Sequence, residues 1–262
     1  MERVSLQPTA VSAMHEVPPL APTPSALKRI KSAGEVTANL IASYSGRRMD
    51  IMDRQNDNDR GYLTRAREVG VVPSFSDRFH DAVSYAVLLH ADQLRKGTEV
   101  PYVSHLLGVA GLAMEYGAAE DEAIAALLHD AVEDQGGKPT LEEIRRRFGD
   151  HVASIVEGCT DTDQQPKPPW RERKQAYIDH VLHASSSVCL VSACDKLHNS
   201  RCILSDVRFE GDAAYRKFKG GKDGTLWYYR ALVNAFGEKI PKRLADELER
   251  VIAELERVSS GH

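Results

Sequence analysis

From Ser74 onward, apolar residues recur every three or four positions, which is the spacing of one face of an α-helix. Phe79, Val83, Ala86, Val87 and His90 form the first such face. The alternation of β-branched and polar residues that is typical of a half-buried strand is almost absent. The sequence therefore predicts an all-α domain, and a folded part of about 190 residues is long enough to bury a core.

The same spacing predicts the other helices. A capping box, Thr140 to Glu143, indicates the start of one helix, which Gly149 interrupts. Glycines mark helix ends at Gly117 and at Gly136. The remaining helices are predicted at 103–116, 120–134, 151–158, 169–184, 187–205, 225–236 and 242–258.

Residues 1–73 differ in composition from the rest. Five of the twelve prolines in the chain lie between Pro8 and Pro24, a density that prevents continuous helix or sheet. A short amphipathic helix fits residues 28–45, and residues 47–67 are strongly polar. We expect a proline-rich, poorly ordered extension over 1–73, followed by the folded domain over 74–262.

Composition and charge exclude several classes of protein. The longest apolar run, Leu106 to Met114, has nine residues, whereas a membrane-spanning helix needs about twenty. The net charge of −4 argues against a surface that coats nucleic acid. The four cysteines form no C-x-x-C pattern, which favours buried thiols in a reducing compartment. The sequence therefore predicts a cytoplasmic protein that binds neither membranes nor nucleic acid.

Four polar residues stand at the end of an apolar helical segment. The apolar residues 123–128 lead directly into His129, Asp130, Glu133 and Asp134. Burying charges beside a core is costly unless something compensates them, and a divalent cation would do so. Mixed imidazole and carboxylate donors suit Mn²⁺, Fe²⁺ or Zn²⁺. The alternative interpretation is a surface cluster of acidic residues, which is common near helix ends.

A second carboxylate emerges from an apolar stretch in the same way. Asp195 follows the apolar residues 188–194, and Asn199 lies one helical turn further on. His198, three residues after Asp195, is an alternative ligand.

Together these segments resemble the HD-domain metal-dependent phosphohydrolases. The resemblance depends on His105, the His129-Asp130 doublet and Asp195, in that order. Within that superfamily, the sequence most resembles the hydrolase domain of RelA/SpoT-type enzymes, and this resemblance covers about residues 75–255. A domain of this size is similar to the small alarmone hydrolases. The motifs that carry it are His90-Ala-Asp-Gln-Leu-Arg-Lys-Gly97, Pro101-Tyr-Val-Ser-His105, His129-Asp-Ala-Val-Glu-Asp134 and Asp195-Lys-Leu-His-Asn-Ser-Arg201.

Two positions depart from the pattern of this family. Leu106 stands where many members have proline, and Asp92 stands where glycine is frequent. Neither position is a ligand, so the departures concern loop detail.

The resemblance implies an HD-domain helical bundle with one metal ion. The ion is usually Mn²⁺, with Zn²⁺ and Fe²⁺ as alternatives, and its implied ligands are His105, His129, Asp130 and Asp195. Glu133 and Asp134 are implied to orient or deprotonate the attacking water. The expected substrate contacts are Arg95, Lys96, Lys196, Asn199 and Arg201, with Lys222 and Tyr228 added from a basic and aromatic group late in the chain.

The function that the resemblance implies is hydrolysis of the 3′-pyrophosphate of guanosine tetra- or pentaphosphate. The expected partner is thus a small guanine nucleotide, and the sequence leaves both a monomer and a homodimer open. Two alternatives remain open. One is an HD phosphohydrolase acting on another nucleotide, such as a deoxynucleotide or a 2′/3′-phosphorylated dinucleotide. The other is a non-catalytic HD module that binds a nucleotide.

Overall fold

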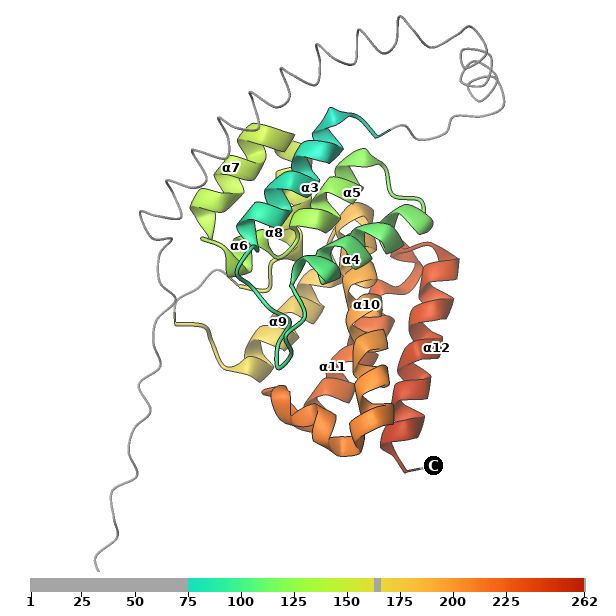
Figure 1. The fold of residues 1–262 in the computed structure, drawn as a ribbon. Coiled ribbons are helices and arrows are strands. Elements are labelled where there is room, and N and C mark those ends of the chain that lie inside the picture. The colour runs from blue at the N-terminus through green and yellow to red at the C-terminus, as the bar shows by residue number, and fades with distance from the viewer. Residues whose placement is uncertain (1–74, 163–165, 262) are drawn as a thin grey trace, which may run out of the picture. The chain divides into compact units, whose positions relative to one another are not determined.

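The computed structural model describes residues 75–162 and 166–261, and every regular element in these ranges is helical (Figure 1). This confirms the predicted all-α class. The predicted extension over 1–73 and its helix at 28–45 lie outside the described residues. The elements are α3 (Asp77–Leu89), α4 (Val103–Glu115), α5 (Glu120–Leu128), α6 (Ala131–Asp134), α7 (Lys138–Phe148), α8 (Asp150–Cys159), α9 (Trp170–Val181), α10 (Ser186–Glu210), η1 (Gly211–Lys217), α11 (Gly221–Phe236), η2 (Gly237–Lys239) and α12 (Lys242–Ser259).

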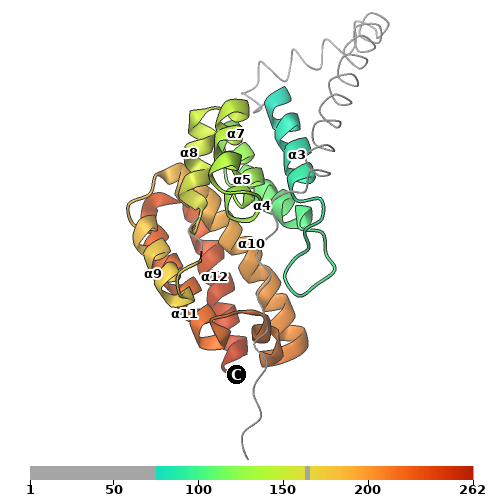
Figure 2. The ribbon, with the colours of Figure 1, turned by 90° about the vertical axis from the view of Figure 1, so that its left-hand side faces the viewer.

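Helix α10 is the central element of the fold. Residues 188–195 are buried without interruption, which is the pattern of a helix covered on all sides. Figures 1 and 2 show α4, α5 and α8 around one end of α10, and α11 and α12 beside the rest of it. Asp195, which ends this buried run, is therefore carried into the centre of the domain.

Three local expectations were wrong in detail. The segment 120–134 is two helices, because the chain turns at His129 and Asp130 before α6 begins. Thr140 does not form the expected capping box, because α7 begins at Lys138 and Thr140 lies inside the helix. Its hydroxyl donates a hydrogen bond to the Gln135 carbonyl instead. On α3, Val87 is 43% exposed, whereas Ala82 and Tyr85 are buried together with the expected Ala86 and His90.

Within the described residues, no helix combines the length and the apolar character that crossing a bilayer requires.

Candidate metal centre and nucleotide site

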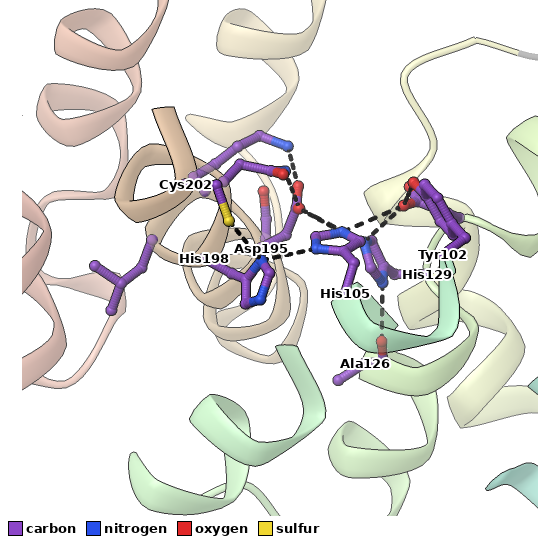
Figure 3. A network of polar contacts seen from close by, with 12 residues as sticks. Tyr102, His105, Ala126, His129, Asp195, His198 and Cys202 are labelled. Atoms are coloured by element: carbon purple, nitrogen blue, oxygen red, sulfur yellow. Dashed lines mark hydrogen bonds and ion pairs between the residues drawn. The ribbon is translucent and has the colours of Figure 1, made fainter. Parts of the chain in front are cut away.

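Three separate elements bring the four expected ligands together. His105 lies in the first turn of α4, His129 and Asp130 form the turn between α5 and α6, and Asp195 comes from the middle of α10. Figure 3 shows the two imidazole rings between Asp195 on one side and Tyr102 on the other. The turn that interrupts the predicted helix 120–134 is thus the feature that supplies two adjacent ligands.

The ligand atoms are close enough to share one cation. His105 Nε2 is 3.2 Å from Asp195 Oδ1 and 3.6 Å from Asp130 Oδ2. His129 Nε2 is 3.1 Å from Asp130 Oδ2 and 3.6 Å from Asp195 Oδ1. Two donors at right angles, each about 2.1 Å from an ion, are about 3 Å apart. The spacing therefore fits a single metal ion.

The two imidazole nitrogens that face this point have no hydrogen-bond partner among the described residues, although both are buried. They lie near carboxylate oxygens, but not in hydrogen-bonding geometry. An unpartnered buried nitrogen is costly, and coordination of a cation removes the cost. Together with the carboxylates, these nitrogens make a site that fits a divalent metal ion.

Each histidine is held by its other ring nitrogen. His129 Nδ1 donates to the Ala126 carbonyl at 2.8 Å, which leaves Nε2 free to ligate. His105 Nδ1 lies 3.0 Å from His198 Nδ1 (Figure 3). His198, which the sequence offered as an alternative ligand, thus lies behind His105. Burial, with the nearby His105 and Arg95, lowers the pKa of His198 to about 4. The His198 ring is therefore neutral and can accept a hydrogen bond from His105 Nδ1–H.

The carboxylates are held in the same way. The Tyr102 hydroxyl donates to Asp130 Oδ2 at 2.5 Å. Asn199 Nδ2 donates to Asp195 Oδ1 at 2.5 Å, and the Lys196 ammonium donates to Asp195 Oδ2 at 2.5 Å. Each ligand therefore has a second contact that fixes its orientation, as is usual in metal sites.

Opposite charges set the protonation states at the site. Burial alone would raise the pKa of Asp195, but the Lys196 ammonium and the two histidines hold it well below its usual range. Burial would likewise lower the pKa of His129, but the carboxylates of Asp130 and Asp195 raise it well above its usual range. Without metal, the site thus holds ionised carboxylates and a protonated His129.

Metal binding is therefore expected to displace a proton from His129. Because Nε2 must lose its proton to ligate, we expect release of about one proton per ion near pH 7 and weaker binding as the pH falls. Calorimetric titration with Mn²⁺ in buffers of different ionisation enthalpy measures this release. A binding enthalpy that is the same in every buffer would contradict the proposed protonation state.

Gly108 gives the His198 ring the space that it needs. A Cβ atom at Gly108 would lie 2.4 Å from His198 Cδ2 and Nε2, so Gly108→Ala must displace the ring that supports His105. We expect metal affinity to fall about ten- to a hundredfold, as when an outer contact of a ligand is lost. Gly111→Ala on the same helix is the control, because nothing lies within 4 Å of its Cβ position. Equal metal affinities for the two variants would count against this role.

Asp134 is held by Gln93, a residue of the His90–Gly97 motif for which the sequence alone indicates no role. Gln93 Nε2 donates to Asp134 Oδ2 at 2.8 Å, and Gln93 Oε1 accepts from His90 Nδ1 and Gln135 Nε2, both at 2.6 Å. Burial, together with the charge of Asp130, raises the pKa of Asp134 to about 6. Asp134 is therefore an oriented carboxylate that can accept a proton near neutral pH.

Glu133 is paired with a lysine that sequence reasoning missed. Lys167 Nζ lies 2.8 Å from Glu133 Oε1, although 34 residues separate the two in the chain. No local spacing links Lys167 to the acidic cluster, so only the fold reveals the contact.

The expected substrate contacts divide into two groups. Arg95 donates to Asn199 Oδ1 at 2.6 Å, and Asn199 in turn contacts Asp195, so both lie beside the metal centre. Lys96, next to Arg95, extends over the Phe218 ring at 6.0 Å. Lys196 is also beside the centre, but its ammonium is directed to Asp195 and packs over Tyr177.

The other three expected contacts are not joined to the metal centre by any described hydrogen bond or ion pair. Arg201 pairs with Glu247 of α12, and Lys222 pairs with Asp212. Tyr228 is buried beneath Lys174, and its hydroxyl has no described hydrogen-bond partner.

The HD domain family model matches residues 82–225, which include all four expected ligands. The chain therefore belongs to the HD domain family, which implies a divalent metal ion, and His105, His129 and Asp130 lie close enough together to hold one.

Within that family, the chain is similar to guanosine-3′,5′-bis(diphosphate) 3′-pyrophosphohydrolases. It is 43% identical over 124 residues to the MESH1 enzyme of Xenopus tropicalis, covering 46% of this chain and 66% of the relative. It is 40% identical over 139 residues to the MESH1 enzyme of Danio rerio, covering 52% of this chain and 74% of the relative.

Two solved structures align with most of the described domain. A metazoan orthologue of SpoT that hydrolyses ppGpp aligns with a TM-score of 0.57 and 26% identity, covering 70% of this chain and 97% of the other. The lmo0812 protein of Listeria monocytogenes aligns with a TM-score of 0.51 and 31% identity, covering 60% of this chain and 99% of the other.

Proposed function

We propose that this chain is a metal-dependent hydrolase that removes the 3′-pyrophosphate of guanosine tetra- and pentaphosphate. The products are pyrophosphate and GDP or GTP, so the reaction ends an alarmone signal. The observation that carries the proposal is the convergence of two histidines and two aspartates on one point, in a chain similar to enzymes of this activity. His105, His129, Asp130 and Asp195 are the proposed ligands.

The proposed metal is Mn²⁺, which suits mixed imidazole and carboxylate donors. Bound there, it would supply Lewis acidity to a phosphate oxygen and lower the pKa of a water molecule. The four cysteines are free thiols, which supports a reducing, cytoplasmic location.

The residues around the ligands have separate proposed roles. Asp134, oriented by Gln93, takes the proton of the water that attacks the phosphorus atom next to the 3′ oxygen. Glu133 orients the same water from the neighbouring position on α6. Its partner Lys167 adds a positive charge where the pyrophosphate accumulates negative charge.

Arg95 and Asn199 are proposed to hold the nucleoside. Their contact joins the 93–101 segment to α10 one helical turn from Asp195, so a sugar placed there has its 3′ oxygen near the metal centre. The Arg95 guanidinium also lies over the Tyr102 ring at 5.6 Å, which keeps it stretched across the site.

A comparison of substrates tests the proposed function. The Mn²⁺-loaded protein is incubated with guanosine tetraphosphate, dGTP and a 2′/3′-phosphorylated dinucleotide, and released pyrophosphate and phosphate are measured. We expect pyrophosphate from guanosine tetraphosphate only. Faster turnover of either other nucleotide would replace the proposal with an HD phosphohydrolase of different substrate.

A further inference from the structure

A group of lysines lies at a distance from the metal centre that suits the other end of the proposed substrate. Lys96 and Lys217 lie over the Phe218 ring, with their ammonium nitrogens 6.0 and 5.6 Å from its centre. Lys219 adds a third charge: burial, and then the charges of Lys219 and Lys217, lower the pKa of Lys96. We call Lys96, Lys217 and Lys219 the lysine cluster.

The cluster has more positive charge than the protein neutralises. Lys217 donates to Asp206 Oδ2 at 2.5 Å, whereas Lys96 and Lys219 have no ion-pair partner among the described residues. The positive charges of Lys217 and Lys219 act against that of Lys96, and one carboxylate offsets only part of this repulsion, so an anion bound beside the three ammonium groups would relieve it.

The fold holds the cluster against the rest of the site. The 93–101 segment folds back on itself through hydrogen bonds from Arg95 N to the Val100 carbonyl and from Tyr102 N to the Gln93 carbonyl. Its tip packs against η1, where an added Cβ at Gly97 would lie 3.5 Å from Lys217 Cδ. One segment therefore contacts the proton acceptor Asp134 through Gln93 and the cluster through its tip.

Helix α10 carries one residue at each charged region, Asp195 at the metal centre and Asp206 beside Lys217. Asp195, Asn199 and Asp206 occupy positions i, i+4 and i+11, so they lie along one face of the helix. At 1.5 Å per residue, Asp195 and Asp206 are about 16 Å apart along its axis. This is comparable with the span of a nucleoside that carries phosphate chains on both its 3′ and 5′ oxygens.

We propose that Lys96, Lys217 and Lys219 form a subsite for the 5′-phosphate chain of the nucleotide whose 3′ group lies at the metal centre. The inference rests on the proposed function for the identity of the 3′ group. In such a subsite, each added 5′ phosphate increases the affinity for the nucleotide, so the pentaphosphate binds more tightly than the tetraphosphate.

The test varies the number of 5′ phosphates. Guanosine 3′-pyrophosphates with one, two or three 5′ phosphates are bound at equilibrium to the Mn²⁺-loaded Asp134→Asn variant, in which turnover does not interfere. Affinity is expected to rise with each phosphate. When Lys219→Gln is combined with Asp134→Asn, binding of the nucleotide with three 5′ phosphates should weaken about three- to tenfold, and binding of the nucleotide with one 5′ phosphate should weaken much less. Lys219→Arg in place of Lys219→Gln should restore the affinity.

Arg216→Gln is the matched control, because it removes one positive charge from the same segment at a side chain outside the cluster. In the otherwise unchanged enzyme, Lys219→Gln should raise KM and leave kcat unaltered, as expected for a contact made equally in the ground and transition states. Equal losses for all three nucleotides, or equal losses in Lys219→Gln and Arg216→Gln, would overturn the subsite.

The two proposals fail separately in these measurements. If the wild-type protein does not hydrolyse the nucleotides but its affinity still rises with 5′ phosphates in a Lys219-dependent way, the subsite stands and the proposed activity is wrong. If it hydrolyses them and affinity is independent of the number of 5′ phosphates, the activity stands and the subsite is wrong.

Discussion

Asp130→Ala is expected to abolish turnover and to lower the metal content of the purified protein. The substitution removes an oxygen that lies 3.1 Å from His129 Nε2 and 3.6 Å from His105 Nε2, so the proposed site loses one of its four donors. It also leaves the Tyr102 hydroxyl without its acceptor. We expect kcat/KM to fall by about three orders of magnitude or more, because the metal's chemistry is lost with the metal.

Metal analysis and steady-state kinetics on the same preparation measure both effects. Asp81→Ala is the control, since Asp81 is an exposed aspartate on α3. Circular dichroism shows whether the variant keeps its helical content. A folded Asp130→Ala protein with full activity and no bound metal would show that the site is not catalytic.

Asp134→Asn is expected to keep the metal and lose most of the turnover. The amide has nearly the same shape as the carboxylate and can still contact Gln93, but it cannot accept a proton. Loss of a general base lowers kcat about a hundred- to ten-thousandfold. An unchanged kcat with metal retained would remove Asp134 from the mechanism.

The pH dependence of the wild-type enzyme provides a second measurement of the same role. The base works only when ionised, and burial raises the pKa of Asp134 to about 6. Activity should therefore decline as the pH falls through about 6 or, because a bound cation favours the ionised form, somewhat lower. With Mn²⁺ kept saturating at every pH, residual activity of Asp134→Asn should lack this acid limb. A wild-type limb above pH 7 would point to a different group.

Glu133→Gln is expected to act in the same direction as Asp134→Asn. It retains the side-chain length but removes the charge that pairs with Lys167, so both the water and the lysine lose a fixed partner. Lys167→Gln separates the two effects, because it leaves the Glu133 carboxylate in place. A Glu133→Gln enzyme with wild-type kcat would remove the assigned role.

Three of the four proposed ligands could be picked out from the sequence because each follows an apolar helical segment, whereas His105 is singled out by the resemblance to HD-domain enzymes. His129 and Asp130 end the buried run of α5, and Asp195 ends the buried run of α10. A polar side chain in such a place is costly to bury, so its position favours a compensating partner, and the other motifs distinguish this from a surface cluster. Helical periodicity likewise predicted the all-α class.

The contacts of Asn199 and Lys196 with Asp195 are local in the sequence, but the other supporting contacts could not be predicted, because they join residues that are distant in the chain. His105 and His198 are 93 residues apart, and Gln93 and Asp134 are 41 residues apart. Periodicity also failed to show the turn between α5 and α6. The helical spacing of apolar residues continues through 120–134. In the structure, the His129 ring donates to the Ala126 carbonyl, and Asp130 is the residue that immediately precedes α6.

The central claim is that this chain hydrolyses a 3′-pyrophosphate only when a metal occupies the centre formed by His105, His129, Asp130 and Asp195. The direct test incubates metal-stripped protein with guanosine tetraphosphate, with and without added Mn²⁺, and separates the products by ion-exchange chromatography. We expect GDP and pyrophosphate in equal amounts with Mn²⁺ and intact nucleotide without it. Cleavage that proceeds equally in the metal-stripped protein, or no cleavage with Mn²⁺ demonstrably bound, would contradict the account.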